Sequence, residues 1–415
     1  MVDISKQPTL NIGTVGPVNS GKSKTLYALT GTNTSKFKDE KVRNITIKLG
    51  YTNCKIYKCP VHRCYSSTDS DSPSPVCPRC SSEMVLTRHV SFVDCPGHEL
   101  LTTTMTTGAS AIDSALFLIA ANEPFPQSQS VEHLLTLESL GVSSVIILLN
   151  KIDLITEEKG KELKQSIDNF FRGTCAENAP VIPMSAQQKI NIDILCEYLI
   201  TKIPEPITNT SNPVMEVLRS FDVNKPGDLA KDIKGGVLGG SVKSGKFTVG
   251  DTIEIRPGMV SRNKETKKQS ITPFITTITS LYTEENELNE AYSGGLVGVG
   301  TTLDPSICSG NKMVGQVIGL VGSMPPVWNK FYLKYKLLQK ADKPVVNEEL
   351  LISCGSSITR SVVTSIDSKK KELHISLELP VCCDESKRVI LSRKINGHWK
   401  LIGNGVVSGG KKILE

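Results

Sequence analysis

GPVNSGKS at residues 16–23 decides the fold of the first part of the chain. It fits the pattern G-x-x-x-x-G-K-[S/T], in which backbone N–H groups surround phosphates. Lys22 stands where a lysine reaches the β and γ phosphates, and Ser23 stands where a hydroxyl binds Mg²⁺. The loop lies between the apolar run TLNIGTV and a helix expected from Lys24 to Leu29, so the helix N-terminus faces the phosphates. The residues expected to bind the nucleotide here are Asn19, Ser20, Gly21, Lys22, Ser23 and Lys24.

Three further motifs follow in order along the chain and specify the rest of the ligand. DCPG at 94–97 supplies Asp94 as a second-sphere magnesium carboxylate. NKID at 150–153 supplies Asp153, which can accept both N–H donors on the edge of a guanine. SAQ at 185–187 completes the set, which predicts binding of GTP and GDP. The residues expected to enclose the base are Asn150, Lys151, Ser185, Ala186 and Gln187.

Each motif alone occurs by chance in unrelated chains, so the joint match carries the prediction. All four appear in the expected order, and each follows an apolar run that is typical of a strand: TLNIGTV, HVSFV, SVIILL and APVIPM. The chance alternative is therefore rejected.

Length and composition fit a multidomain cytoplasmic protein. At 415 residues the chain has room for about two to four domains. No run approaches the roughly 20 apolar residues that cross a bilayer, and the N-terminus MVDISKQPTLNIG has no charged-then-apolar signal. We expect the twelve cysteines to be reduced, so their clusters predict metal sites or buried apolar side chains.

Charge is distributed unevenly between the two halves. Residues 1–206 carry 20 Lys and Arg against 21 Asp and Glu, whereas residues 207–415 carry 28 against 21. A positive field over the second half favours a polyanionic partner such as RNA. A solvated surface excess explains the same numbers, and charge alone does not separate the two.

The order of predicted elements indicates three domains. Strands and helices alternate to about residue 203, which predicts a mostly parallel sheet with helices on both faces. The Pro- and Asn-rich stretch 204–213 breaks this pattern as a linker does. After it come short β-branched runs separated by Gly pairs, which predict two β-barrels with a boundary near GSMPPVW, residues 322–328. The expected domains are a GTP-binding domain at 1–206 and barrels at 207–325 and 326–415.

Two features lie between the phosphate loop and Asp94. RNIT at 43–46 places Thr46 where a switch loop offers oxygen to magnesium and the γ phosphate. CPVHRCYSSTDSDSPSPVCPRC at 59–80 contains two cysteine pairs, and four thiolates can form a tetrahedral structural zinc site. The predicted ligands are Cys59, Cys64, Cys77 and Cys80, with His62 as an alternative to Cys64; reduced cysteines without metal are the other interpretation.

These segments together resemble one family, the gamma subunit of eukaryotic translation initiation factor two, a translational GTPase of the elongation factor Tu superfamily. The resemblance covers nearly the whole chain, and NITIKLGY, RSFDVNKPG and the cysteine-bearing insert distinguish it from elongation factor Tu. The segments that carry it are NIGTVG, RNITIKLGYTNCKIYKC, HVSFVDCPGHELLTTTM, PQSQSVEHL, ILLNKIDL, MSAQQKINIDILCEYL, RSFDVNKPG, GGVLGGS, IEIRPG, GGLVGVGT, MVGQVIG and HWKLIGNG.

The resemblance implies a function beyond nucleotide binding. It implies a GTP-binding domain and two β-barrels, and a heterotrimer with alpha and beta subunits. It also implies GTP-dependent delivery of methionylated initiator tRNA to the small ribosomal subunit, together with GTPase-activating and nucleotide-exchange factors. The tRNA end is expected between the GTPase domain and the first barrel, where Asn44 and Tyr51 are candidate contacts. For Tyr51, stacking on a base and filling a strand face are equally compatible with the sequence.

The phosphate loop departs from the family pattern. Family members usually carry GHVxHGKS or GHVxHGKT, whereas Pro17 and Ser20 replace the two histidines here and Asn19 takes the variable position. Pro17 contributes no N–H, so nucleotide affinity and hydrolysis rate are the properties in question. His98, directly after DCPG, stands where the superfamily orients the attacking water, which makes it the predicted catalytic residue.

Three classes of function therefore remain open. The first is a tRNA-carrying GTPase. The second is a selenocysteine-specific elongation factor, which we expect to have a further C-terminal RNA-binding extension, whereas this sequence stops at Glu415. The third is a scaffold that binds GTP, scarcely hydrolyses it and holds the other subunits together, because all chemistry at such a site is positioning.

Overall fold

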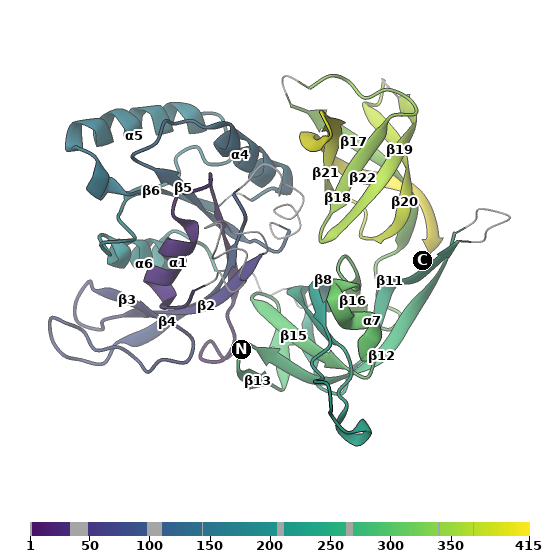
Figure 1. The fold of residues 1–415 in the computed structure, drawn as a ribbon, viewed down its shortest axis with the longest axis horizontal. Helices are drawn as coiled ribbons and strands as arrows, with labels where there is room; N and C mark the ends of the chain where they lie inside the picture. The colour runs from purple at the N-terminus through teal and green to yellow at the C-terminus, as the bar shows by residue number, and fades with distance from the viewer. Residues whose placement is uncertain are drawn as a thin grey trace. The chain divides into compact units, whose positions relative to one another are not determined.

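The computed structural model describes residues 2–33, 49–97, 110–142, 144–205, 211–262, 269–338, 341–367 and 369–415. The chain divides into two compact units, Met1–Ile207 and Thr208–Glu415 (Figure 1). Within the described ranges, no helix has the length and apolar character needed to span a membrane.

A seven-stranded sheet in the order β3-β2-β4-β1-β5-β6-β7 forms the centre of the first unit. β1, β4, β5, β6 and β7 are parallel, whereas at one edge β2 pairs antiparallel with both β4 and β3. The parallel part follows from the alternation of strands and helices, since parallel neighbours need a crossover connection. The strands are β1 (Leu10–Val15), β2 (Gly50–Lys58), β3 (Tyr65–Thr68), β4 (Val85–Asp94), β5 (Ser114–Ala120), β6 (Ser144–Asn150) and β7 (Val181–Pro183).

Helices cover both faces of this sheet (Figure 1). Leu116 and Leu118 of β5 share a buried cluster with residues of α1 and α6 on one face. Phe117, between them, points the other way and packs edge-on against Phe171 of α5, with ring centroids 5.1 Å apart. Burial on both faces explains why β5 is apolar at nearly every position. The helices are α1 (Lys22–Thr30), α4 (Ser128–Leu140), α5 (Glu157–Phe171), α6 (Ile192–Thr201) and the 3-10 helix η2 (Ile152–Leu154).

The first part of the second unit is a β-barrel. Its strands follow the order β11-β16-β8-β9-β15-β12, and pairing of β12 with β11 closes the ring. The strands are β8 (Val214–Phe221), β9 (Val237–Ser244), β11 (Thr252–Arg262), β12 (Gln269–Thr283), β15 (Leu296–Thr301) and β16 (Val317–Leu320), with β13 (Asn286–Leu288) at one edge. Shorter elements are β10 (Lys246–Thr248), β14 (Glu290–Tyr292), α7 (Pro305–Cys308), η3 (Ala230–Asp232) and η4 (Ser309–Asn311).

The second part is a closed six-stranded antiparallel barrel in the order β17-β20-β19-β18-β21-β22. Its interior holds the indole of Trp328, whose Nε1–H donates to the Cys383 carbonyl over 2.9 Å. The strands are β17 (Val327–Leu337), β18 (Glu349–Cys354), β19 (Ser357–Asp367), β20 (Glu372–Cys382), β21 (Arg388–Ile395) and β22 (His398–Leu414). The predicted fold class, a GTP-binding α/β domain followed by two β-barrels, is therefore confirmed.

The glycine pairs do not all separate strands as the sequence suggested. Gly239 and Gly240 lie inside β9, and Gly409 and Gly410 lie inside β22. A Cβ on Gly240 would stand 2.0 Å from the Glu216 carbonyl oxygen of the paired strand. That pair permits close approach of two strands, which is the other common use of glycine in a sheet.

Candidate nucleotide-binding site

The phosphate loop connects β1 to α1 through backbone angles that few residues adopt. Gly16 has φ 141°, Asn19 has φ 64° and Gly21 has φ 93°. Gly21 also has no room for a side chain, because a Cβ there would stand 2.2 Å from Nδ2 of Asn150. The motif glycines are therefore required by left-handed backbone and by close packing.

Lys22 lies folded over this loop and is almost fully buried. Its Nζ donates to the carbonyl oxygens of Gly16 over 2.9 Å and of Pro17 over 2.8 Å. Burial lowers the pKa of Lys22 to about 8, and the charge of Asp94 opposes this shift. An ammonium held in a dry loop by carbonyl oxygens suits the stabilisation of phosphate charge.

Asp94 at the end of β4 is buried and accepts two hydroxyl hydrogen bonds. Ser23 Oγ donates to Oδ2 over 2.7 Å, and Thr14 Oγ1 donates to Oδ1 over 3.0 Å. A serine hydroxyl that donates to a carboxylate keeps its oxygen lone pairs for a cation. Hydroxyl and carboxylate oxygens are the donor set that magnesium prefers, so these residues fit the ion that the motif implies. Sequence reasoning did not find Thr14.

Asn150 joins three of the four sequence motifs. Its Nδ2 donates to the Ser20 carbonyl of the phosphate loop over 2.9 Å. Its Oδ1 accepts from the backbone N–H of Ala186 over 3.0 Å. The side chain is 2% exposed, so both bonds are shielded from water. Asn150 thus fixes the phosphate loop and the SAQ loop relative to β6.

The residues predicted to enclose the base surround this junction. Asp153 lies in η2 with an exposed side chain, and Gln187 is exposed as well. Ser185 and Ala186 are buried beneath them. Lys151 has φ 65°, and its Nζ stands 3.9 Å from a carboxylate oxygen of Glu123. The exposed carboxylate of Asp153 is accessible to a ligand, as the predicted contact with a guanine edge requires.

Two residues of α4 contact the phosphate loop and were not identified as site residues from sequence. Gly16 N–H donates to Nδ1 of His133 over 2.7 Å. Val18 N–H donates to Oε1 of Gln129 over 2.9 Å. The segment PQSQSVEHL contributed only to the family resemblance, although its glutamine and histidine stand four apart on one helix face.

Of four other predicted site residues, three lie outside the described part of the chain and one lies within it. Asn44, Thr46 and His98 lie outside the described residues. Tyr51 lies on β2, half-buried and opposite Val93 of β4.

The cysteine-rich insert brings four ligand groups together. One ligand atom each from Cys59, His62, Cys77 and Cys80 lies within 4.8 Å of the other three. Cys59 Sγ stands 3.6 Å from Cys80 Sγ and 3.8 Å from His62 Nδ1. These separations match the edge of about 3.8 Å of a tetrahedron with arms of about 2.3 Å. Cys64, predicted from spacing, is outside this group of four, and burial together with a hydrogen bond with Cys77 raises the pKa of its thiol.

Backbone donors support thiolate chemistry in the same cluster. Cys59 Sγ accepts from the N–H groups of Val61 over 3.4 Å and His62 over 3.3 Å. Backbone hydrogen bonds, led by that from Arg79, lower the pKa of Cys77 to about 7. A metal-binding thiol must be deprotonated, so these hydrogen bonds favour metal binding, whereas burial raises the pKa of the Cys59 thiol.

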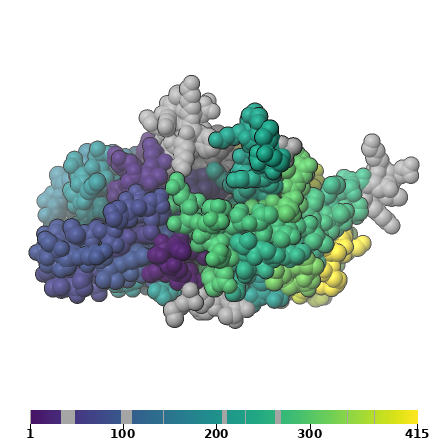
Figure 2. All heavy atoms as spheres, turned by 90° about the horizontal axis from the view of Figure 1, so that it is seen from below, coloured from purple at the N-terminus to yellow at the C-terminus, as the bar shows by residue number. Residues whose placement is uncertain are grey.

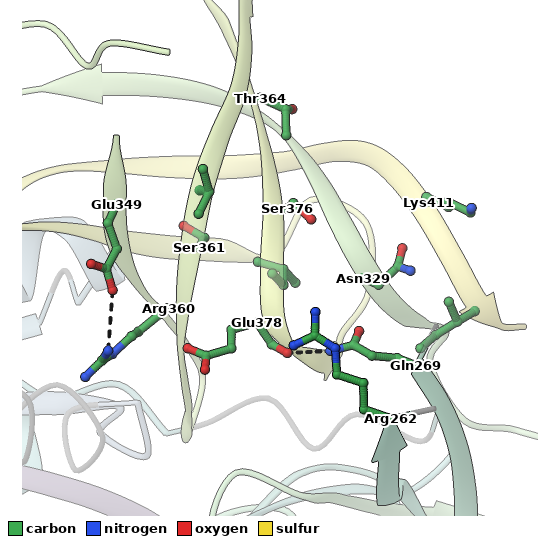
Figure 3. Close-up of a pocket in the computed structure, with 13 residues that line it drawn as sticks. Arg262, Gln269, Asn329, Glu349, Arg360, Ser361, Thr364, Ser376, Glu378 and Lys411 are labelled. Atoms are coloured by element: carbon green, nitrogen blue, oxygen red, sulfur yellow. Dashed lines mark hydrogen bonds and ion pairs between the residues drawn. The ribbon is translucent and has the colours of Figure 1, made fainter. Parts of the chain in front are cut away.

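A separate cavity of about 870 Å³ lies in the second unit and is lined from both barrels (Figure 3). Its charges are mixed: Arg360 stands 3.6 Å from Glu349 in an ion pair. Cations and carboxylates together give no clear preference for a polyanion, so the charge argument for RNA gains nothing here. The lining residues are Arg262, Gln269, Asn329, Glu349, Arg360, Ser361, Val362, Thr364, Ser376, Leu377, Glu378, Lys411 and Ile413.

Three protein-family models match successive parts of the chain. The elongation factor Tu GTP binding domain matches residues 7–205, and elongation factor Tu domain 2 matches residues 235–319. The initiation factor eIF2 gamma C-terminal domain matches residues 331–407.

Curated relatives resemble the chain over almost its whole length. It is 45% identical to eukaryotic translation initiation factor 2 subunit 3 of Drosophila melanogaster, over 99% of this chain and 90% of that protein. It is 46% identical to the gamma subunit of the same factor from Encephalitozoon cuniculi, over 99% and 95%. The gamma subunit of Schizosaccharomyces pombe is 45% identical over 99% and 96%.

Solved structures share the fold at much lower identity. A bacterial selenocysteine-specific elongation factor EF-Sec superimposes with a TM-score of 0.72 at 18% identity, over 97% of this chain and 59% of that one. Elongation factor SelB of Methanococcus maripaludis, in complex with the GTP analogue GppNHp, gives 0.72 at 20% identity, over 98% and 80%. These likenesses establish the fold alone.

The matches define a translational GTPase whose GTP-binding domain is of the elongation factor Tu type, and such a domain works with GTP, GDP and Mg²⁺. The chain belongs to the family of gamma subunits of eukaryotic translation initiation factor 2. It is a GTPase subunit of a translation initiation factor, and the resemblance found in the sequence is confirmed.

Proposed function

We propose that this protein carries methionylated initiator tRNA to the small ribosomal subunit in a GTP-dependent manner, as one subunit of a heterotrimer with alpha and beta partners. The proposal is supported by a phosphate loop tied through Asn150 to the guanine-recognition loops, in a chain that matches initiation factor subunits over 99% of its length. Initiation takes place in the cytoplasm, where we expect the protein to act.

In this proposal, different residues of the chain bind different parts of the nucleotide. The loop from Asn19 to Lys24 binds the phosphates, Lys22 neutralises part of their charge, and Asp153 accepts hydrogen bonds from the edge of the guanine. Ser23 and Thr46 would hold Mg²⁺, and Asp94 orients the Ser23 hydroxyl. The ion would neutralise charge that develops on the β and γ phosphates during hydrolysis. His98 orients the attacking water, and Asn44 and Tyr51 contact the tRNA.

The decisive experiment measures initiator tRNA binding by the assembled heterotrimer with GTP and with GDP. A switch requires the two nucleotide states to differ in affinity for the tRNA, since a ligand shifts an equilibrium only through differential binding. We expect tighter binding with GTP by at least tenfold. Equal affinities would instead favour the scaffold that merely holds the subunits together. Preference for selenocysteinyl-tRNA over the initiator would favour the elongation-factor alternative.

An exposed apolar segment supports assembly with other subunits. The connection between β8 and β9 starts after Phe221, which is 38% exposed, and includes Val223 at 44%, Leu229 at 61% and Ile233 at 51%. Atoms of this teal segment project from the surface of the second unit (Figure 2). Exposed apolar surface often marks protein contacts, and four exposed apolar side chains in one connection make this segment the candidate contact for a partner subunit.

Charge introduced into this segment tests its role in assembly. We expect Leu229→Asp with Ile233→Asp to weaken capture of one partner subunit at least tenfold while GDP binding is retained. Val249→Asp, at an apolar side chain 41% exposed outside the segment, is the matched control. Retained assembly in the double variant contradicts this use of the segment.

We further propose a structural zinc ion held by Cys59, His62, Cys77 and Cys80. All four positions are filled by protein groups, so the ion would stabilise the insert and take no part in hydrolysis. Metal analysis of the purified chain should give about one zinc per molecule. Cys77→Ser with Cys80→Ser should abolish it and leave GDP binding within a small factor. Absence of zinc, with none taken up on addition, refutes the site.

Substitutions at residues 62 and 64 separate the two ligand sets. His62→Ala should reduce zinc content, whereas Cys64→Ser should retain it if histidine is the fourth ligand. The reverse result would restore the four-cysteine set predicted from spacing.

A further inference from the structure

Two side chains of helix α4 form hydrogen bonds with the backbone of the phosphate loop. Gln129 and His133 stand one turn apart on α4 and accept the N–H groups of Val18 and Gly16, over 2.9 Å and 2.7 Å. His133 is 5% exposed, so water competes little for its bond. The two bonds flank Pro17, which has no N–H of its own.

The bond to Gly16 requires one chemical form of the imidazole. A ring nitrogen that accepts an N–H must be unprotonated, so Nδ1 carries the lone pair and the proton of the neutral ring is on Nε2. Burial, reinforced by the charge of Lys22, lowers the pKa of His133 to about 3. The neutral acceptor form is therefore the one present at physiological pH.

The position of Gly16 is coupled to that of the lysine on the phosphates. Nζ of Lys22 donates to the carbonyl oxygens of Gly16 and Pro17, the stretch of backbone between the two N–H groups held by α4. Gly16 has φ 141°, and a Cβ there would stand 2.4 Å from the Leu118 carbonyl oxygen. Only a glycine fits this close to the β5 backbone, and the N–H of the same residue is hydrogen-bonded to α4.

We propose that His133 is a positioning residue for the nucleotide. Its Nδ1 fixes Gly16, and Gly16 in turn fixes the two carbonyl oxygens that orient Lys22. His133 itself does not touch the nucleotide. Loss of the acceptor leaves the Gly16 N–H unsatisfied until a water or a loop movement pairs it, and the loop then holds phosphates less well. This inference rests on the proposed nucleotide site. GDP and GTP should both be affected, because both carry the β phosphate that Lys22 is expected to reach.

Two substitutions at residue 133 separate hydrogen bonding from packing. In His133→Asn, Oδ1 occupies the place of Nδ1 and keeps an acceptor. In His133→Leu, a side chain of similar bulk has none. His89 provides the matched control, because it is a fully buried histidine of the same unit whose Nδ1 lies 3.0 Å from the Ile4 carbonyl, and no bond joins it to the phosphate loop.

The experiment measures dissociation of fluorescent mant-GDP and mant-GTP from the full chain by stopped flow, with calorimetric melting of each variant. We expect His133→Leu to accelerate release of both nucleotides about tenfold, equivalent to about 1.4 kcal/mol. His133→Asn should stay within about threefold of wild type, and His89→Leu should lower the melting temperature without changing release.

The possible results distinguish this inference from the proposed function. Wild-type release rates in a folded His133→Leu protein overturn the inference while nucleotide binding stands. Equal acceleration in the asparagine and leucine variants also overturns it, because the effect is then one of packing. Failure of wild type to bind either nucleotide overturns the proposed function itself.

Discussion

Replacement of Asn150 by alanine should weaken GDP and GTP equally and strongly. The substitution removes two hydrogen bonds of 2.9 and 3.0 Å from a side chain that is 2% exposed. It leaves the Ser20 carbonyl and the Ala186 N–H without their partner in a buried place. Each unsatisfied buried group costs about 1–3 kcal/mol.

The expected loss follows from these two groups. Part of the cost falls on the stability of the apo protein and part is relieved by water, so about 3 kcal/mol appears in nucleotide binding. That loss corresponds to a dissociation constant raised roughly 150-fold. Both nucleotides should lose the same factor, because Asn150 bonds to backbone groups of two loops and not to the γ-phosphate side of the site.

The assay is equilibrium titration of mant-GDP and mant-GTP, with xanthine nucleotides as competitors. Asn169→Ala is the control, since that asparagine lies on the exposed side of α5. Asn150→Ala should weaken guanine and xanthine nucleotides in parallel. Affinities within threefold of wild type would show that the loops keep their positions without Asn150. A loss confined to GTP would place Asn150 near the γ phosphate, and either result refutes the reasoning.

The other tests concern the base, the pH dependence of stability and hydrolysis. Asp153→Asn should shift preference from guanine toward xanthine, because two acceptors become one acceptor and one donor; unchanged GTP affinity contradicts that role. The pKa of His133 is lowered from 6.5 to about 3 in the folded state, so the unfolded state binds more protons below pH 6.5 and stability falls as the pH drops. Calorimetry between pH 7 and pH 5 should show a loss of about 2 kcal/mol from this group, and His133→Asn should remove that part of the slope. Intrinsic hydrolysis should be slow and strongly stimulated by an activating partner, as no arginine lies in the phosphate loop. His98→Ala should abolish the stimulation in single-turnover assays and spare binding; full stimulation in that variant removes His98 from its role.

The parts of the site that sequence predicted are those fixed by local backbone geometry. A phosphate loop needs glycine where φ is positive and a lysine that can fold back over it, so Gly21 and Lys22 are recognisable from spacing alone. The parallel sheet with helices on both faces follows similarly from alternating strands and helices. The antiparallel edge strands β2 and β3 were not predicted, because nothing in an isolated β run specifies the direction of its partner.

The contacts that sequence missed join segments far apart in the chain. His133 lies 117 positions after Gly16, and Asn150 lies 130 positions after Ser20. Such pairs are set by how α4 and β6 pack on the sheet, and a single sequence carries no record of that packing. The motif predicted Asn150 at the base, which stays a prediction; the structure adds hydrogen bonds from its side chain to the backbone of two neighbouring loops.

The cluster of cysteine and histidine side chains shows the same limit over a short distance. Spacing favoured Cys64, yet the pairing of β2 with β3 ends at Lys58 and Tyr65, so residues 59–64 close a tight loop. Cys59 N–H donates to the Cys64 carbonyl over 2.9 Å, and the turn between them brings His62 Nδ1 to 3.8 Å from Cys59 Sγ. Backbone geometry inside the loop therefore brings His62 beside Cys59, while Cys64 is hydrogen-bonded with Cys77.

The unusual Pro17 is accommodated by the same helix that positions the loop. Proline costs a loop one N–H, and that loss is harmful where the donor would face a phosphate or a buried acceptor. Here the neighbouring donors on Gly16 and Val18 are turned toward α4, while the Pro17 carbonyl accepts from Lys22 and from Ser20 Oγ. Pro17 thus takes part in these hydrogen bonds through its carbonyl oxygen. Ser20, at a position where the family usually has histidine, contributes a hydroxyl that stabilises the turn. With Pro17 and Ser20 in place, hydrogen bonds of the loop run from Gly16 and Val18 to α4 and from Lys22 and Ser20 to the Pro17 carbonyl, so the buried acceptors of α4 are a main restraint on its backbone.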